Sequence, residues 1–222
     1  MTHHRRRNNG IDPSKINETV ELSPAQRYAA FKQTQAKQRT VAAEFARSMP
    51  FELDEFQMQA NDALEAGDNV LVAAPTGAGK TVAADFAIYL AQTRNVKAFY
   101  TTPIKALSNQ KYHDLVDQYG TDKVGLLTGD TSINSEADIV VMTTEVLRNM
   151  LYEHSVTLEA LRYVILDEVH YLADRFRGPV WEEVIIHLPK NVNIIGLSAT
   201  VSNVEDFSEW IESVRGKTTL VM

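Results

Sequence analysis

From residue 54 onward, short apolar segments alternate with longer segments whose apolar residues recur at helical spacing. The apolar segments, such as 70–74 and 163–166, contain no polar position, as in strands buried on both faces of a parallel sheet. The alternation therefore predicts an α/β fold with a mainly parallel sheet covered by helices on both sides. The expected helices span 23–47, 54–66, 79–92, 105–119, 145–152, 179–187 and 204–214, and the expected strands span 69–73, 97–101, 124–127, 138–142, 162–166, 193–197 and 218–222.

The first 50 residues differ from the rest of the chain. Residues 1–22 are polar without helical or strand periodicity, so we expect a disordered basic arm. Its three consecutive arginines could bind phosphate, although a run of charges is more often simply solvated. Ser23 and Pro24 are suited to the N-cap and first turn of a helix. That helix has sparse apolar positions, so we expect residues 23–50 to form an extension outside the main core.

Composition excludes several classes of protein. The chain has 222 residues, of which 44% are hydrophobic and 23% charged, as in ordinary globular domains. It has no cysteine, which excludes disulfides, cysteine-bound metal and a cysteine nucleophile. No apolar run approaches the ~18 residues of a membrane span, and no apolar segment follows the basic start. We therefore expect a cytoplasmic protein that does not enter the membrane.

The net charge of −7 is unevenly distributed. Residues 1–50 contain nine Lys and Arg against four Asp and Glu, whereas residues 51–222 contain thirteen against twenty-five. An acidic body does not hold nucleic acid by bulk electrostatics. Any nucleic-acid binding by residues 51–222 must therefore be local, through backbone amides, hydroxyls and helix ends.

A phosphate-binding loop is the strongest chemical signal. Residues 74–81 read APTGAGKT, after an apolar strand and at the start of a helix. Glycines let backbone amides turn toward phosphate oxygens, and the helix N-terminus adds positive potential. Lys80 is expected to neutralise the β- and γ-phosphates, and the Thr81 hydroxyl to bind Mg²⁺. The expected ATP-binding residues of this loop are Ala74, Pro75, Thr76, Gly77, Ala78, Gly79, Lys80 and Thr81.

Two adjacent carboxylates, Asp167 and Glu168, follow the expected strand 162–166. In a nucleotide site the first carboxylate holds Mg²⁺ and the second positions and deprotonates the attacking water. Alone, the string DEVH is equally compatible with a solvated acidic turn. Together with the phosphate loop, it predicts a catalytic set of Lys80, Asp167 and Glu168, with Mg²⁺ and ATP bound.

The order of these motifs resembles the superfamily two helicases. After APTGAGKT come TTPIKALSNQK, TGD, TTE, DEVH and SAT, in the family's order. FELDEFQ and DRFRGPVWEEVIIHLP narrow the resemblance to the superkiller-type DExH-box RNA helicases, and within them to the actinobacterial HelY-type proteins. The resemblance implies a first RecA-like, P-loop NTPase domain over residues 51–219. It also implies that residues 220–222 begin a linker to a second RecA-like domain, whose motifs IV, V and VI the sequence does not contain.

The resemblance also implies roles for individual residues. Gln57 would bind the adenine edge, and Phe51 would pack on the adenine ring or, equally well, in the core. His170, Ser198 and Thr200 would couple the nucleotide site to the nucleic-acid site. Arg148 is a possible extra nucleic-acid contact, but a simple exposed charge is the commoner case. One strand of nucleic acid would lie along Pro103, Lys105, Thr128, Gly129, Thr143 and Glu145.

These features predict the ATP-binding domain of an ATP-dependent helicase that acts on single-stranded RNA. A repair-type DNA helicase is an alternative, because the contacts that distinguish the ribose of RNA from the deoxyribose of DNA depend on other domains. A nucleotide-binding module that does not translocate is a second alternative, which the intact Lys80 and Glu168 argue against. Arginines from a second domain contribute ~10³–10⁵ in rate in related enzymes, so we expect the chain alone to be nearly inactive.

Overall fold

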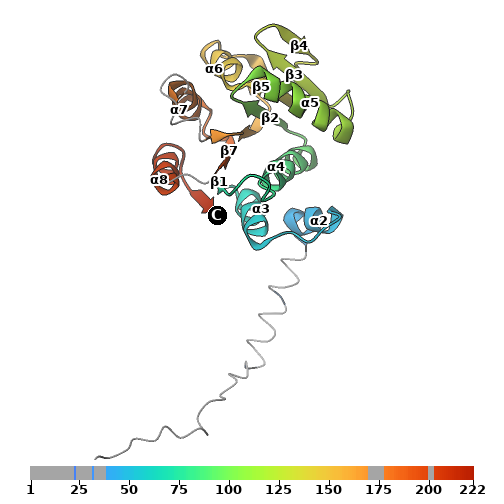
Figure 1. The fold of residues 1–222 in the computed structure, drawn as a ribbon, viewed down its shortest axis with the longest axis vertical. Coiled ribbons are helices and arrows are strands. Elements are labelled where there is room, and N and C mark those ends of the chain that lie inside the picture. The colour runs from blue at the N-terminus through green and yellow to red at the C-terminus, as the bar shows by residue number, and fades with distance from the viewer. Residues whose placement is uncertain (1–22, 24–31, 33–38, 170–177, 200–202) are drawn as a thin grey trace, which may run out of the picture. The chain divides into compact units, whose positions relative to one another are not determined.

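The computed structural model describes residues 23, 32, 39–169, 178–199 and 203–222 (Figure 1). Within it, residues 41–222 form one compact unit, and the description below concerns that unit. The helices are α2 (Val41–Ser48), α3 (Glu55–Ala66), α4 (Thr81–Arg94), α5 (Lys105–Tyr119), α6 (Thr144–Tyr152), η2 (Val156–Leu158), α7 (Gly178–His187) and α8 (Val204–Arg215). The strands are β1 (Asn69–Ala73), β2 (Lys97–Thr102), β3 (Val124–Thr128), β4 (Thr131–Ile133), β5 (Ile139–Thr143), β6 (Leu161–Leu166), β7 (Asn193–Ser198) and β8 (Thr218–Val221).

The strands form one sheet in the order β4-β3-β5-β2-β6-β7-β1-β8. Every neighbouring pair is parallel except β3 and β4, which pair antiparallel. Because parallel strands end at the same edge, the segments that follow β1, β2, β5, β6 and β7 all leave the sheet at one edge. That edge is where open α/β sheets bind their ligands.

Helices cover both faces of the sheet, as the apolar pattern predicts. On β6, Tyr163 and Ile165 pack in a core with α2, α3, α4 and α5, while Val164 and Leu166 pack in a second core with α6 and α7. Figure 1 shows α6, α7 and α8 on one side of the strands and α2 to α5 on the other. The expected three-layer α/β architecture is confirmed. Among the described residues, no helix has the length and apolar character needed to cross a bilayer.

Helix α2 differs from the expectation. Residues 39 and 40 form a turn, and α2 begins only at Val41 rather than continuing an unbroken helix from residue 23. The Glu65 carboxylate of α3 explains this start, since it accepts the backbone N–H of Val41 at 2.9 Å and of Ala42 at 2.7 Å. Phe45 is buried against Phe86, so α2 belongs to the core and not to an outer extension.

One further detail was not expected from the pattern, and another corrects what the resemblance implied. Residues 131–133 form the short edge strand β4, which folds back on β3 as a hairpin and pairs Leu126 with Ile133. At the other edge, Leu220 and Val221 lie in β8 and pair with Leu71 and Val72 of β1. Residues 220 and 221 are thus part of the sheet rather than the start of a linker.

Candidate functional site

The expected phosphate loop connects β1 to α4 at the carboxyl edge of the sheet. Gly77 and Gly79 have φ angles of +85° and +79°, a left-handed conformation that glycine adopts without strain. The Lys80 ammonium donates hydrogen bonds to the carbonyl oxygens of Ala74 at 2.7 Å and Pro75 at 3.1 Å. The loop therefore curls around the ammonium group. An incoming phosphate would exchange these neutral acceptors for a charged one, which binds ammonium more strongly.

Helix α4 starts directly after this loop, with the exposed residue Thr81 in its first turn. The free backbone N–H groups of a helix N-terminus attract anions. The loop amides, the Lys80 ammonium and the Thr81 hydroxyl therefore offer charge, hydrogen-bond donors and a metal ligand within one short segment.

Gln57 connects α3 to the phosphate loop. Its Oε1 accepts the backbone N–H of Asp54 at 2.9 Å, and its Nε2 donates to the Gly79 carbonyl at 3.1 Å. A Cβ at Gly79 would lie only 2.5 Å from Nε2, so the Gln57 side chain would have to shift and give up this contact. The nearby Phe51 is 49% exposed, which argues against packing in the core and leaves its ring available to a ligand.

Asp167 and Glu168 follow β6 at the same edge of the sheet. Asp167 Oδ1 accepts the backbone N–H of Glu168 at 2.9 Å, and Oδ2 accepts the hydroxyl of Tyr100 at 2.8 Å. Burial, followed by the charge of Asp167, raises the pKa of Tyr100 well above its ordinary value, so the phenol stays a proton donor. Glu168 has a φ of +56°, a strained conformation for a residue with a side chain that is typical of functional sites.

Oxygen atoms of these residues could hold a hard divalent cation such as Mg²⁺. The Thr81 hydroxyl and the Asp167 carboxylate would supply hard oxygen ligands, which Mg²⁺ prefers, and water and phosphates would complete its shell. A carboxylate has about four lone-pair positions, so Asp167 keeps acceptor capacity beyond its two hydrogen bonds. In the part of the chain that the structure describes, no cluster of three or more His, Cys, Asp or Glu is placed to hold a metal ion.

The end of β7 adjoins the phosphate loop. The carbonyl of Ser198 accepts the backbone N–H of Ala74 at 3.2 Å, and the Ser198 hydroxyl donates to the Ala199 carbonyl at 2.8 Å. Ser198 is thus in direct contact with the segment expected to bind phosphate. His170 and Thr200, which the resemblance assigns to the same coupling role, lie outside the described residues.

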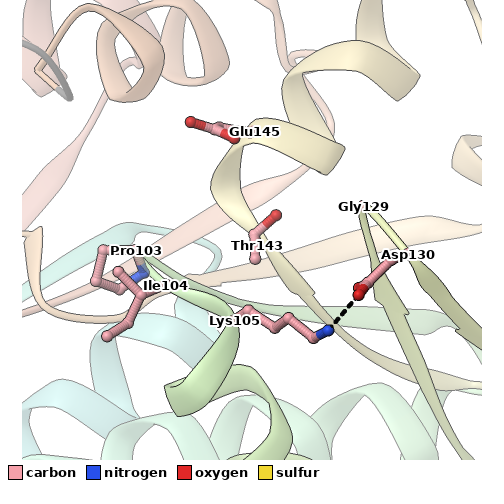
Figure 2. A pocket seen from close by; sticks show the side chains of 7 residues that line it. All are labelled: Pro103, Ile104, Lys105, Gly129, Asp130, Thr143 and Glu145. Atoms are coloured by element: carbon pink, nitrogen blue, oxygen red, sulfur yellow. Dashed lines mark hydrogen bonds and ion pairs between the residues drawn. The ribbon is translucent and has the colours of Figure 1, made fainter.

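A pocket of about 360 Å³ lies where β2, β3 and β5 end (Figure 2). Helices α5 and α6 begin beside it, with Ile104 and Thr143 as their N-caps. Two helix N-termini at one pocket favour anions such as the phosphates of a nucleic-acid strand. Thr128, also expected at this site, is buried next to the pocket. The lining residues are Pro103, Ile104, Lys105, Gly129, Asp130, Thr143 and Glu145.

An ion pair crosses this pocket. Lys105 Nζ lies 2.5 Å from Asp130 Oδ2, and the Thr128 hydroxyl donates to the other carboxylate oxygen at 3.1 Å. These hydrogen bonds hold the pKa of Asp130 below its ordinary value. Sequence reasoning did not single out Asp130, although it is the last residue of the TGD motif. Arg148 lies outside the pocket lining and pairs with Glu183 at 3.7 Å.

The comparison with protein families decides the class of this protein. The sequence model of the DEAD/DEAH box helicases matches residues 54–207. This range includes the phosphate loop, the carboxylates after β6, Ser198 at the end of β7, and the residues that line the pocket. The chain belongs to the DEAD/DEAH box helicase family. The resemblance inferred from the motifs is confirmed.

Individual relatives agree with this assignment. The chain is 62% identical over 178 residues to "Probable helicase HelY" of Mycobacterium tuberculosis, covering 80% of this chain and 20% of the relative. It is 52% identical over 172 residues to human "Superkiller complex protein 2", covering 78% and 14%. Among solved structures, the helicase Lhr of Mycobacterium smegmatis bound to ssDNA and AMP-PNP matches with a TM-score of 0.66 at 29% identity, covering 82% and 27%. The chain thus spans a fifth or less of the length of these two sequence relatives.

Proposed function

We propose that this chain is the ATP-binding domain of an ATP-dependent helicase that moves along single-stranded RNA. The observation that carries the proposal is the shared edge of the sheet. The phosphate loop after β1 and the carboxylates after β6 leave that edge beside a pocket flanked by two helix N-termini. A nucleotide site and a strand-binding site on one rigid sheet are what a nucleic-acid motor requires.

In this proposal the residues of the nucleotide site divide the work. Lys80 binds the β- and γ-phosphates, while Thr81 and Asp167 hold Mg²⁺, which when bound neutralises phosphate charge and orients the γ-phosphate. Glu168 lies next to Asp167 and positions the attacking water, from which it accepts a proton. Gln57 binds the adenine edge, and the half-exposed Phe51 covers the ring.

The strand-binding role rests on the pocket. The N-termini of α5 and α6 and the hydroxyl of Thr143 would contact phosphates without reading the bases. Ser198, hydrogen-bonded to the phosphate loop, together with His170 and Thr200, would transmit the state of the nucleotide toward the strand.

RNA is the proposed substrate because the motifs resemble those of superkiller-type RNA helicases. A DNA helicase is the second candidate, favoured by the similarity to Lhr, whose solved structure holds ssDNA. ATPase measurement on the longer parent protein with RNA and with DNA of equal length separates the two. Greater stimulation by RNA supports the proposal, and stimulation by DNA alone overturns this part of it.

Two substitutions test the nucleotide site. Lys80→Ala should weaken Mg-ATP binding by about tenfold or more, because it removes a charge-assisted phosphate contact worth roughly 1.5–3 kcal/mol. Glu168→Gln should leave affinity within about twofold but abolish hydrolysis in the longer protein, because Glu168 acts on the water. Calorimetry measures affinity, and phosphate release measures turnover. Equal loss of affinity in both variants would contradict this division of roles.

A further inference from the structure

Tyr100 is a buried polar group for which neither the sequence motifs nor the proposed chemistry has a role. It lies in β2, is 1% exposed, and pairs with Ile165 of the neighbouring strand β6. Its hydroxyl reaches the end of β6 and donates a hydrogen bond to Asp167 Oδ2 at 2.8 Å. A fully buried tyrosine thus directs its one polar atom at the carboxylate expected to hold the metal.

With this hydrogen bond, the backbone N–H and both carboxylate oxygens of Asp167 have partners. The backbone N–H of Asp167 donates to the Thr101 carbonyl at 2.9 Å, and the other carboxylate oxygen accepts the N–H of Glu168 at 2.9 Å. The backbone contacts fix where the residue sits. The Tyr100 hydroxyl holds the second carboxylate oxygen, and therefore resists rotation of the carboxylate about its side-chain bonds.

The ring of Tyr100 is itself in contact with a charged side chain of α5. Lys111 of α5 places its ammonium 5.1 Å from the ring centroid, within the range of a cation–π interaction. The charge of Lys111 also acts on Asp85 of α4, whose carboxyl lies on the same side of the sheet. The helix that begins at the pocket therefore contacts, through Lys111, the tyrosine that contacts the carboxylate.

We propose that Tyr100 is a positioning residue that orients the Asp167 carboxylate for Mg²⁺, with Lys111 holding the tyrosine ring in place. The proposal rests on the proposed nucleotide site and adds a residue outside the motifs that define it. Partners of metal ligands of this kind typically change metal affinity or activity about 10–100-fold when removed.

The test measures binding of a fluorescent ATP analogue to the chain, once with Mg²⁺ and once with EDTA. The ratio of the two dissociation constants reports the metal and requires no catalysis. Tyr100→Phe should lower the Mg²⁺-dependent gain in affinity by about tenfold, with the affinity in EDTA unchanged. The matched control is Tyr163→Phe, which removes another buried hydroxyl on the same side of the sheet, one that is hydrogen-bonded to Arg94. That control should keep the wild-type ratio.

The outcomes separate the two proposals. If the wild-type chain binds the analogue without any Mg²⁺ dependence, or not at all, the nucleotide site itself is wrong. If Mg²⁺ tightens binding to the wild-type chain and Tyr100→Phe has the same ratio, only the positioning role is overturned. If Tyr100→Phe does not fold, Lys111→Met replaces it. A reduced ratio in Lys111→Met supports the proposal, and an unchanged ratio overturns it.

Discussion

The buried carboxyl group of Asp85 makes the stability of the folded chain depend on pH. It lies in α4 between largely buried neighbours, and burial raises its pKa from 3.8 to about 6, opposed by the charge of Lys111. The folded chain therefore binds this proton more tightly than the unfolded chain does. By linkage, the stabilising contribution is complete below pH 3.8 and is lost as the pH rises through about 6.

Asp85→Asn should therefore change the pH dependence of stability. The free energy of unfolding of the variant, relative to wild type, should rise between pH 4 and pH 7. A shift of one pKa unit corresponds to about 1.4 kcal/mol, so the rise can reach roughly 3 kcal/mol. The attraction between Lys111 and the ionised Asp85 carboxylate grows as Asp85 loses its proton, and it is already contained in the net pKa shift. Urea unfolding of both proteins at several pH values measures the difference, and parallel curves would contradict the expectation.

At the scale of elements, the pocket is built where two helices begin and a hairpin turns. The N-termini of α5 and α6 favour phosphate, but Asp130, between β3 and β4, places a carboxylate beside Lys105. Figure 2 shows this pair reaching across the pocket. A strand that binds Lys105 through a phosphate has to replace this carboxylate, so the ion pair competes with nucleic acid.

Asp130→Asn should consequently strengthen binding of single-stranded RNA. An exposed ion pair contributes little because water screens it, so the gain should be at most about fivefold. The slope of the logarithm of affinity against the logarithm of salt concentration should also become steeper by about one. The reason is that Lys105 becomes available to one more phosphate. Fluorescence anisotropy across a salt series measures both. The control is Glu136→Gln, whose ion pair with Lys97 at 2.8 Å is also partly exposed but lies at the start of β2, the opposite edge of the sheet. Equal effects in both variants would indicate bulk charge instead.

At the scale of the whole molecule, the proposed site combines a candidate phosphate loop, a candidate metal ligand and a candidate base on one acidic domain. Lys80 brings one cation to the phosphate loop. Charge that develops on the γ-phosphate in the transition state calls for a second cation. The resemblance assigns that cation to a second RecA-like domain, which is consistent with relatives five or more times longer than the matched region.

We therefore predict that this chain alone binds Mg-ATP weakly and hydrolyses it hardly at all, without stimulation by RNA. An absent arginine finger lowers the rate by ~10³–10⁵ in related enzymes. Steady-state ATPase measurement with and without poly-uridine tests this, with Glu168→Gln as the background. Robust RNA-stimulated turnover would mean that a second copy of the chain supplies the cation, and a dependence of the specific activity on protein concentration would identify that case.

The sequence by itself determined the fold class and the chemistry of the phosphate loop. Both are local: buried parallel strands require uninterrupted apolar runs, and a phosphate loop requires glycines, a lysine and a hydroxyl at fixed spacing. Helix α5 and strand β1 accordingly have the predicted bounds. Edge strand β4 escaped prediction because three residues of mixed character, partly or fully exposed, carry no apolar period.

Only the tertiary structure decided which distant residues meet. The start of α2 depends on Glu65, more than twenty positions further along the chain, because that carboxylate accepts the backbone N–H groups of Val41 and Ala42. Asn61 is 1% exposed, and within the described residues nothing explains its unpaired amide. Tyr100 reads as an ordinary strand residue until β2 and β6 pair and bring its hydroxyl to Asp167. Such contacts arise from strand order and register, which no local pattern encodes.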